Sequence, residues 1–189
     1  LERYLRVRGH QFQVLAPNDL LSPNETILLP GVGTFSQGMD YLSVTGLKQK
    51  IQTHAFSGGR VLGICLGMQM LLETSAESPN SEGLGLILGS CGRIPSSPGF
   101  AVPHIGWNEL VLPSVVHDSF QQISQTSGIT ASDFYFVHSY VAHPLSADTV
   151  IASFEHPCGL LAAAVAQENV IGFQFHPEKS GSAGYALLD

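Results

Sequence analysis

The chain has 189 residues, of which 44% are hydrophobic and 12% are charged, and its formal net charge is −7. A chain of this length and apolar content is long enough to bury the core of one domain. Its eight lysine and arginine residues form no cluster, which argues against nucleic-acid binding, because that function needs a basic stripe. No apolar run approaches the roughly 18 residues of a membrane-spanning helix. We therefore expect neither nucleic acid nor a membrane as a partner.

The three cysteines, Cys65, Cys91 and Cys158, are spaced too widely for a disulfide framework or a zinc knuckle. Free thiols are typical of a reducing compartment, so the sequence predicts a cytoplasmic protein. We expect Cys91 and Cys158 to be structural, because nothing nearby in the sequence would activate them. The histidines outside the motifs described below show no ligand-like spacing, and we predict no metal and no cofactor.

Strands and helices alternate in the first part of the chain. Residues 1–8 form an amphipathic pattern that stops at Gly9 and predicts a helix. Apolar runs predict strands at residues 12–15, 25–29 and 60–64, and helical patterns cover residues 37–42, 47–55 and 68–72. This alternation is typical of a parallel α/β sheet with helices on its faces.

The second half of the chain consists mostly of expected strands. They lie at residues 107–112, 134–138, 150–154, 161–166 and 170–175. Consecutive strands without intervening helices favour some antiparallel pairing. The predicted fold is therefore α/β, with a mixed, mostly parallel central sheet flanked by helices, in a single domain over residues 1–189.

A Gly-x-Cys-x-Gly sequence at residues 63–67 joins an expected strand to an expected helix. This arrangement has the form of a nucleophile elbow, a tight turn that holds one reactive side chain, here Cys65, above a sheet. Glycines are needed there because neighbouring backbone passes close to the turn. The helix that follows directs its free N–H groups toward the sulfur and favours a thiolate. The alternative is a small buried cysteine in a glycine-rich core turn.

His176 and Glu178 follow the last expected strand, with Pro177 restraining the backbone between them. The Glu178 carboxylate would orient the imidazole of His176, and His176 would accept the proton of Cys65. Together the three residues form a candidate catalytic triad. Cys65 and His176 both lie at the ends of expected strands, where catalytic groups of open α/β sheets collect. Taken alone, His176 would more readily be a structural residue and Glu178 a solvated charge.

Pro30-Gly31-Val32-Gly33 follows another buried strand and predicts a turn whose N–H groups face an anion. A tetrahedral intermediate on Cys65 needs two donors for its oxyanion. The candidates are the N–H of Leu66 and that of Val32 or Gly33. A phosphate-binding loop or a purely structural loop is the alternative interpretation.

These motifs together resemble the class I (triad) glutamine amidotransferases. The resemblance is carried by residues 63–69 with His176, Pro177 and Glu178. More narrowly, residues 30–33, 103–108, 136–140 and 175–180 resemble the glutaminase subunits of imidazole glycerol phosphate synthases. The similarity runs over essentially the whole chain, and the Pro-His-x-Gly-Trp-Asn stretch at residues 103–108 is its most specific motif.

The resemblance implies an activity and a partner. Cys65 would attack the side-chain amide of L-glutamine, release ammonia and leave a thioester that water hydrolyses, with His176 as base and acid and Glu178 orienting it. The ammonia would pass through a (β/α)₈-barrel cyclase subunit and join an intermediate there. The products would be imidazole glycerol phosphate and an aminoimidazole carboxamide ribotide, in histidine biosynthesis. We expect the glutaminase subunit alone to be nearly silent, because a glycine-hinged donor at residues 31–33 can flip.

The resemblance also assigns further residues. The family's substrate-contacting glutamine corresponds to Gln69, its ammonium-binding glutamate to Glu77, and its pocket-lining segment to His138, Ser139 and Tyr140. The subunit interface is expected to include residues of the Pro-His-x-Gly-Trp-Asn stretch, which are Pro103, His104, Trp107 and Asn108.

The family opens with a strand and a glycine-rich loop that this sequence lacks, and the sequence ends within its expected last helix at Asp189. The resemblance thus implies a domain truncated at the N-terminus and slightly at the C-terminus, without a strand that would be central in the sheet. Other interpretations stay open. They are another triad amidotransferase, such as that of anthranilate, vitamin B6 or guanylate synthesis, a catalytically silent binding subunit, and a cysteine peptidase or ester hydrolase.

Overall fold

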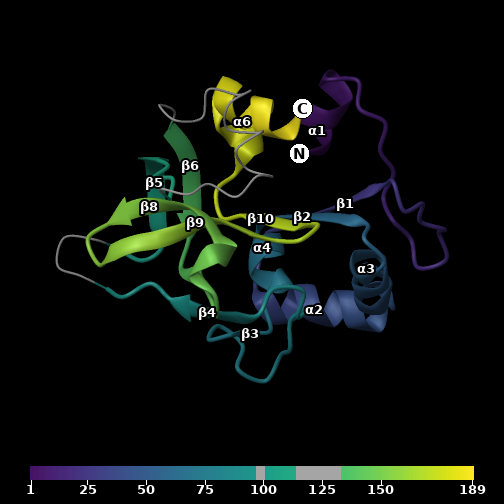
Figure 1. The fold of residues 1–189 in the computed structure, drawn as a ribbon, viewed down its shortest axis with the longest axis horizontal. Helices are drawn as coiled ribbons and strands as arrows, with labels where there is room; N and C mark the ends of the chain where they lie inside the picture. Colours follow the sequence, from purple (N-terminus) through teal and green to yellow (C-terminus); the bar gives the residue numbers. More distant parts are fainter. Residues whose placement is uncertain (97–100, 114–132) are drawn as a thin grey trace.

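The computed structural model describes residues 1–96, 101–113 and 133–189. Figure 1 shows a central sheet with α2, α3 and α4 below it and with α1 and α6 above it. The central sheet has five strands in the order β1-β2-β10-β9-β8. Their bounds are β1 Thr26–Gly31, β2 Arg60–Cys65, β8 Val150–His156, β9 Gly159–Gln167 and β10 Val170–Phe173.

The pairing in this sheet changes direction at its middle. Strand β2 pairs in parallel with β1 and with β10, whereas β10–β9 and β9–β8 are antiparallel. The sheet is therefore mixed, as expected, although its four pairings divide evenly rather than being mostly parallel. Because β1, β2 and β10 run the same way, their carboxyl ends meet at one edge of the sheet.

The helices on the lower face follow their apolar periodicity. They are α2 Phe35–Val44, α3 Leu47–Phe56 and the short α4 Leu66–Leu71. Phe35, Met39 and Leu42 are buried, and a spacing of four and then three residues places them on one helical face. The side chain of Thr34 caps α2 by accepting from the N–H of Gln37 at 3.4 Å.

The helices on the upper face are α1 Glu2–Val7 and α6 Gly181–Leu188, and they pack against each other. The rings of Tyr4 and Tyr185 stack with centroids 4.9 Å apart. The hydroxyl of Tyr4 donates to the carboxylate of Asp189 at 2.5 Å. These contacts bring the two ends of the chain together (Figure 1).

The described residues also form two smaller sheets. One has the order β3-β4-β7, and the other pairs β5 with β6. Their bounds are β3 Thr74–Ser75, β4 Gly89–Arg93, β5 His104–Glu109, β6 Asp133–His138 and β7 Tyr140–Pro144. Short 3₁₀ helices lie at η2 Ala147–Thr149 and η3 Pro177–Lys179.

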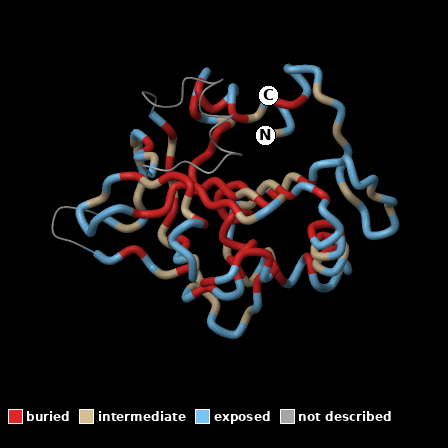
Figure 2. The backbone as a smooth tube through the Cα atoms, in the orientation of Figure 1, coloured by how far each residue is buried: buried red, intermediate tan, exposed pale blue. Residues whose placement is uncertain are grey.

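The core lies between the central sheet and its helices, where Figure 2 shows the buried backbone concentrated. Aromatic rings fill the side near β6 and β10. Five phenylalanines there have at most 2% of their surface exposed, and they are Phe134, Phe136, Phe154, Phe173 and Phe175. This packing holds the ends of β6 and β10 beside the end of β2.

One sequence prediction of a strand was wrong, and another had shifted bounds. Residues 12–15 form no strand, because no neighbouring described strand offers them a hydrogen-bonding edge and an apolar run becomes a strand only when it is paired. The strand expected at 107–112 begins earlier and ends earlier, as β5, with Val111 retaining only an isolated bridge to Ser153. Strands β4 and β7 were not predicted. Among the described residues, no helix has the length and apolar character needed to cross a membrane.

Candidate active site

Cys65 is the last residue of β2, and α4 begins at the next residue. Its backbone has φ 56° and ψ −110°, a conformation that residues other than glycine rarely adopt. Close backbone packing explains the flanking glycines. A Cβ on Gly63 would lie 2.7 Å from the carbonyl group of Gly67, and one on Gly67 would overlap the carbonyl oxygen of Leu29. The structure therefore has the elbow that the sequence predicts.

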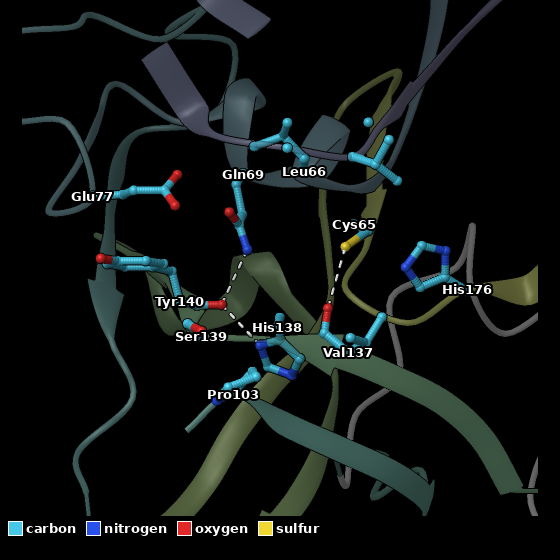
Figure 3. Close-up of a pocket in the computed structure, with 13 residues that line it drawn as sticks. Cys65, Leu66, Gln69, Glu77, Pro103, Val137, His138, Ser139, Tyr140 and His176 are labelled. Atoms are coloured by element: carbon cyan, nitrogen blue, oxygen red, sulfur yellow. Dashed lines mark hydrogen bonds between the residues drawn. The ribbon is translucent and has the colours of Figure 1, made fainter. Parts of the chain in front are cut away.

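His176 lies beside Cys65, three residues after the end of β10. Its Nδ1 is 2.9 Å from Oε1 of Glu178, and both side chains are largely buried. Its Nε2 has no hydrogen-bond partner among the described residues, and Figure 3 shows the ring directed toward the sulfur of Cys65. The structure thus brings Cys65, His176 and Glu178 together in the order that a nucleophile, a base and an orienting acid require.

The charges around His176 favour its protonated form. Burial lowers the pKa of His176, but the adjacent Cys65 and Glu178 raise it more, to about 9. Burial raises the pKa of Glu178, but the hydrogen bond and charge of His176, together with a backbone hydrogen bond, outweigh it and leave that pKa below its usual value. At neutral pH the imidazole is therefore cationic beside the sulfur, and a neighbouring cation stabilises a thiolate.

Ser180 holds the backbone of His176, and sequence reasoning missed it. Its hydroxyl donates to the carbonyl of His176 at 2.7 Å and accepts from the N–H of Tyr135 at 3.0 Å. The N–H of His176 donates to the carbonyl of Tyr135 at 2.9 Å. These bonds join the turn after β10 to β6. Ser180 stands in the 175–180 motif of the sequence analysis but received no role there, because many loops have a serine four residues after a histidine.

A pocket with a volume of about 290 Å³ opens over Cys65. Figure 3 shows the side chains around it. Eleven of the predicted site residues line this pocket, and they are Val32, Gly33, Cys65, Leu66, Gln69, Glu77, Pro103, His138, Ser139, Tyr140 and His176. A cavity of this size suits a small polar molecule such as an amino acid.

The glycine-rich loop starts beside the nucleophile. Gly31 pairs with Cys65 in the β1–β2 register, and a Cβ on Gly31 would lie 2.7 Å from the Cβ of Leu66. The next residues leave the sheet at the rim of the pocket, where Gly33 has φ +105° and the side chain of Val32 is 87% exposed. The residues expected to supply the oxyanion donors, Leu66, Val32 and Gly33, therefore line the same pocket as Cys65.

Gln69 and Glu77 supply polar groups to the other side of the pocket. The amide nitrogen of Gln69 donates to the carbonyl of Tyr140 at 3.1 Å. The carboxylate of Glu77 accepts from the N–H of Phe35 at 2.6 Å, so it also joins the end of the glycine-rich loop to the pocket wall. Figure 3 shows this carboxylate directed toward the side where Gln69 lies.

The four predicted interface residues do not share one surface. Pro103 lines the pocket. His104 stacks on Phe154, with ring centroids 5.2 Å apart, and its Nε2 is 2.9 Å from Oδ1 of Asn108. Trp107 projects from the other face of β5 and is 54% exposed. Pro103 and Trp107 are exposed and His104 and Asn108 are half-buried, so Trp107 is the large exposed aromatic side chain of the four.

His138 is a buried histidine whose Nδ1 donates to the carbonyl of Tyr140 at 2.8 Å, while its Nε2 finds no hydrogen-bond partner in the described part of the chain. Burial lowers the pKa of His138 to about 4, against a smaller opposite effect of the bond to Tyr140. The ring is therefore neutral in the folded protein at neutral pH. In the unfolded chain a histidine binds its proton near pH 6.5.

The lowered pKa of His138 predicts that the folded protein loses stability in acid. Above about pH 6.5 both states are neutral, and as the pH falls toward 4 only the unfolded chain gains the proton. We expect this residue to account for about 2 kcal/mol of the stability lost between about pH 8 and about pH 5. His138→Asn keeps a donor for Tyr140 and should remove that part of the loss in urea titrations at the two pH values. His143→Asn, at an exposed position, is the control. An unchanged pH dependence in His138→Asn would contradict the prediction.

The other two cysteines differ from each other. Burial raises the pKa of Cys91 to about 12, which makes it an inert thiol. Cys158 is exposed, and Nδ1 of His156 lies 2.9 Å from its sulfur. The hairpin between β8 and β9 places this imidazole beside the thiol, a contact that the sequence analysis did not predict. The described residues contain no group of three His, Cys, Asp or Glu side chains arranged to hold a metal.

The chain belongs to the class I glutamine amidotransferase family, whose model, described as "Glutamine amidotransferase class-I", matches residues 1–188. Among curated proteins, it is 41% identical over 174 residues to the imidazole glycerol phosphate synthase subunit HisH of Streptococcus gordonii, covering 92% of this chain and 79% of that protein. It is 42% identical over 180 residues to the subunit of the same name from Methanothermobacter thermautotrophicus, covering 95% and 84%. These matches confirm the family resemblance stated from the motifs.

The fold is also similar to solved structures. The structure of PurLQS from Thermotoga maritima superposes with a TM-score of 0.67 at 20% sequence identity, covering 98% of this chain and 87% of that one. At this identity the likeness concerns the fold alone. It confirms the predicted mixed α/β architecture with a central sheet flanked by helices.

Proposed function

We propose that this chain is the glutaminase subunit of an imidazole glycerol phosphate synthase and acts in histidine biosynthesis. The observation that carries the proposal is the arrangement of Cys65 and His176 over one pocket, with Glu178 2.9 Å behind the imidazole. The relatives at about 40% identity, which are named as subunits of that synthase, support the choice of reaction.

In the first half of the proposed reaction, the thiolate of Cys65 attacks the carbonyl carbon of the glutamine side-chain amide. The carbonyl oxygen becomes an oxyanion, which the N–H of Leu66 and an N–H of Val32 or Gly33 stabilise. The imidazolium of His176 then gives its Nε2 proton to the amide nitrogen. The C–N bond breaks, ammonia leaves, and a γ-glutamyl thioester remains on the sulfur.

In the second half, neutral His176 takes a proton from water, whose oxygen attacks the thioester carbonyl. The C–S bond breaks, glutamate leaves, and the pair returns to thiolate and imidazolium. Glu178 holds the ring in one orientation and stabilises its charge in both halves. Across both halves, glutamine and water become glutamate and ammonia.

The rest of the pocket recognises the amino-acid end of glutamine. The carboxylate of Glu77 suits an ammonium group, and Gln69 presents an amide beside it. His138, Ser139 and Tyr140 form the opposite wall. These few polar groups orient a small substrate, because each one holds a particular end of it.

The proposed partner is a (β/α)₈-barrel cyclase, which receives the ammonia. A direct route is needed because free ammonia in water at neutral pH is mostly ammonium, which is not a nucleophile. Trp107, exposed on β5, is the best-placed described residue of the proposed interface, since large exposed aromatic side chains are common anchors between proteins. Pro103, which is also exposed, would add to that interface, and the contact between His104 and Asn108 would support the strand.

The test measures glutamate release by the chain alone, with the cyclase, and with the cyclase and its nucleotide ligand. We expect the rate to be nearly zero alone and to rise by about two orders of magnitude or more with both, the effect typical of completing an oxyanion hole. Equal turnover with and without the partner would contradict the gating and assign the chain to another amidotransferase reaction. No turnover under any condition would contradict the glutaminase proposal.

A further inference from the structure

Gln174 is a fully buried glutamine that the sequence analysis did not single out. It follows β10 directly and has 0% of its surface exposed. Its backbone N–H donates to the carbonyl of Ala163 at 2.8 Å, so its position between β10 and β9 is fixed. Its side-chain amide lies between two residues of the pocket, Cys65 and Gln69.

The orientation of these amides follows from the carbonyl of Tyr140, which can only accept. It accepts from Nδ1 of His138 at 2.8 Å and from Nε2 of Gln69 at 3.1 Å. A reversed Gln69 amide would place two oxygens against each other, so the nitrogen must face Tyr140. The second hydrogen of that nitrogen goes to Oε1 of Gln174 at 3.2 Å. Both hydrogens of Gln69 are then used, and its oxygen is left for the pocket.

The same argument orients Gln174. Since its oxygen accepts from Gln69, its nitrogen points the other way, and Nε2 lies 4.0 Å from the sulfur of Cys65. The carbonyl of Val137 lies 3.8 Å from the same sulfur. A carbonyl can accept only from the protonated thiol, whereas an N–H donor favours the thiolate. The two neighbours therefore act in opposite directions on the ionisation of the nucleophile.

We propose that Gln174 is a positioning residue of the active site, which stabilises the thiolate of Cys65 through its N–H and holds Gln69 with its oxygen facing the substrate. The second role rests on the proposed glutaminase function, and the first does not. Gln174 is too deeply buried to touch glutamine itself, so it acts through its two neighbours.

A purely structural core glutamine would be expected to bond the backbone, and the chain offers such a case. Gln52 on α3 donates from Nε2 to the carbonyl of Leu84 at 2.8 Å, away from the pocket. The side chain of Gln174 instead contacts side chains at both ends. Gln52→Met is therefore a matched control for Gln174→Met, because each removes a partly or fully buried amide of the same length.

The direct test measures alkylation of Cys65 by iodoacetamide as a function of pH, read by mass spectrometry of the Cys65 peptide in the full chain. Cys158→Ser serves as the background, because Cys158 is exposed. In Gln174→Met we expect the midpoint of the profile to move up by about one pH unit and alkylation at pH values below the midpoint to slow about tenfold, as loss of one hydrogen bond to a charged group implies. Gln52→Met should match the parent. Identical profiles for the two methionine variants would overturn the proposal.

Gln174→Glu separates the effect on the thiolate of Cys65 from the effect on the orientation of Gln69. It also tests the proposal if Gln174→Met fails to fold. A glutamate keeps an oxygen for Gln69 but replaces the donor near the sulfur. With the cyclase complex, we expect the KM for glutamine to stay within about threefold in Gln174→Glu and to rise about tenfold in Gln174→Met, while alkylation slows in both. Equal changes of KM in both variants would overturn the role through Gln69. An inactive parent complex would contradict the glutaminase function but leave the alkylation comparison intact.

Discussion

Cys65→Ala is expected to lower the rate of glutamine hydrolysis by about 10⁴-fold or more, since members of a catalytic triad act as a unit. The substitution removes the atom that forms the thioester, and no other described thiol lines the pocket. His176 and Glu178 would keep their 2.9 Å contact but would have no nucleophile to serve. The measurement is glutamate release by the complex with the cyclase and its ligand.

Cys158→Ala is the matched control for this prediction. Cys158 is also a free cysteine, with an imidazole nitrogen 2.9 Å away, but it lies outside the pocket. We expect its loss to change turnover by less than about twofold, the effect of an ordinary surface substitution. A large loss in Cys158→Ala, or substantial turnover in Cys65→Ala, would mean that the reaction does not proceed at the elbow.

Gly67→Ala is expected to destabilise the folded protein by about 3 kcal/mol or more, because an added methyl group would be forced into packed backbone. The new Cβ would overlap the carbonyl oxygen of Leu29 on β1. A backbone atom in a paired strand cannot turn aside as a flexible side chain can, so α4 would have to move away from the sheet. Alanine favours a helix over glycine by only about 1 kcal/mol, which does not offset the overlap.

Gly106→Ala serves as the control, because a Cβ there meets nothing within 4 Å. Urea unfolding of both variants at one pH gives the two free energies of unfolding. We expect Gly106→Ala to stay within about 0.5 kcal/mol of the parent, as surface substitutions usually do. A Gly67→Ala protein as stable as the parent would contradict the prediction, because it would show that a methyl group fits at this position.

Much of the fold could be predicted where the pattern is local. The helix at α2, the strands at β1, β2, β6, β8, β9 and β10, and the turn at Cys65 follow from periodicity and glycine placement within short windows. The strand expected at residues 12–15 could not be settled in this way, since pairing depends on a neighbour distant in sequence. Strands β4 and β7 were missed for the related reason that their sequences are rich in small or mixed residues, and only their mutual pairing makes them a sheet.

The candidate site divides along the same line. Cys65, His176 and Glu178 could be named from motifs, because the backbone around them requires particular neighbours, which are the glycines that flank Cys65 and the proline between His176 and Glu178. Gln174 and Ser180 could not, because a glutamine or serine beside a histidine motif has no distinctive spacing. Their contacts to Cys65, Gln69 and Tyr135 exist only after β10 has been placed between β2 and β9.

The sequence by itself determined the α/β class, the elbow, the family and the residue types available for chemistry, because these depend on composition and on short-range backbone rules. Only the tertiary structure decided which charges surround His176, that His138 is buried and neutral, and which way the amides of Gln69 and Gln174 point. The physical reason is that burial, pKa and hydrogen-bond direction depend on atoms of residues more than 70 positions apart in the chain, and local sequence carries no information about which of them become neighbours.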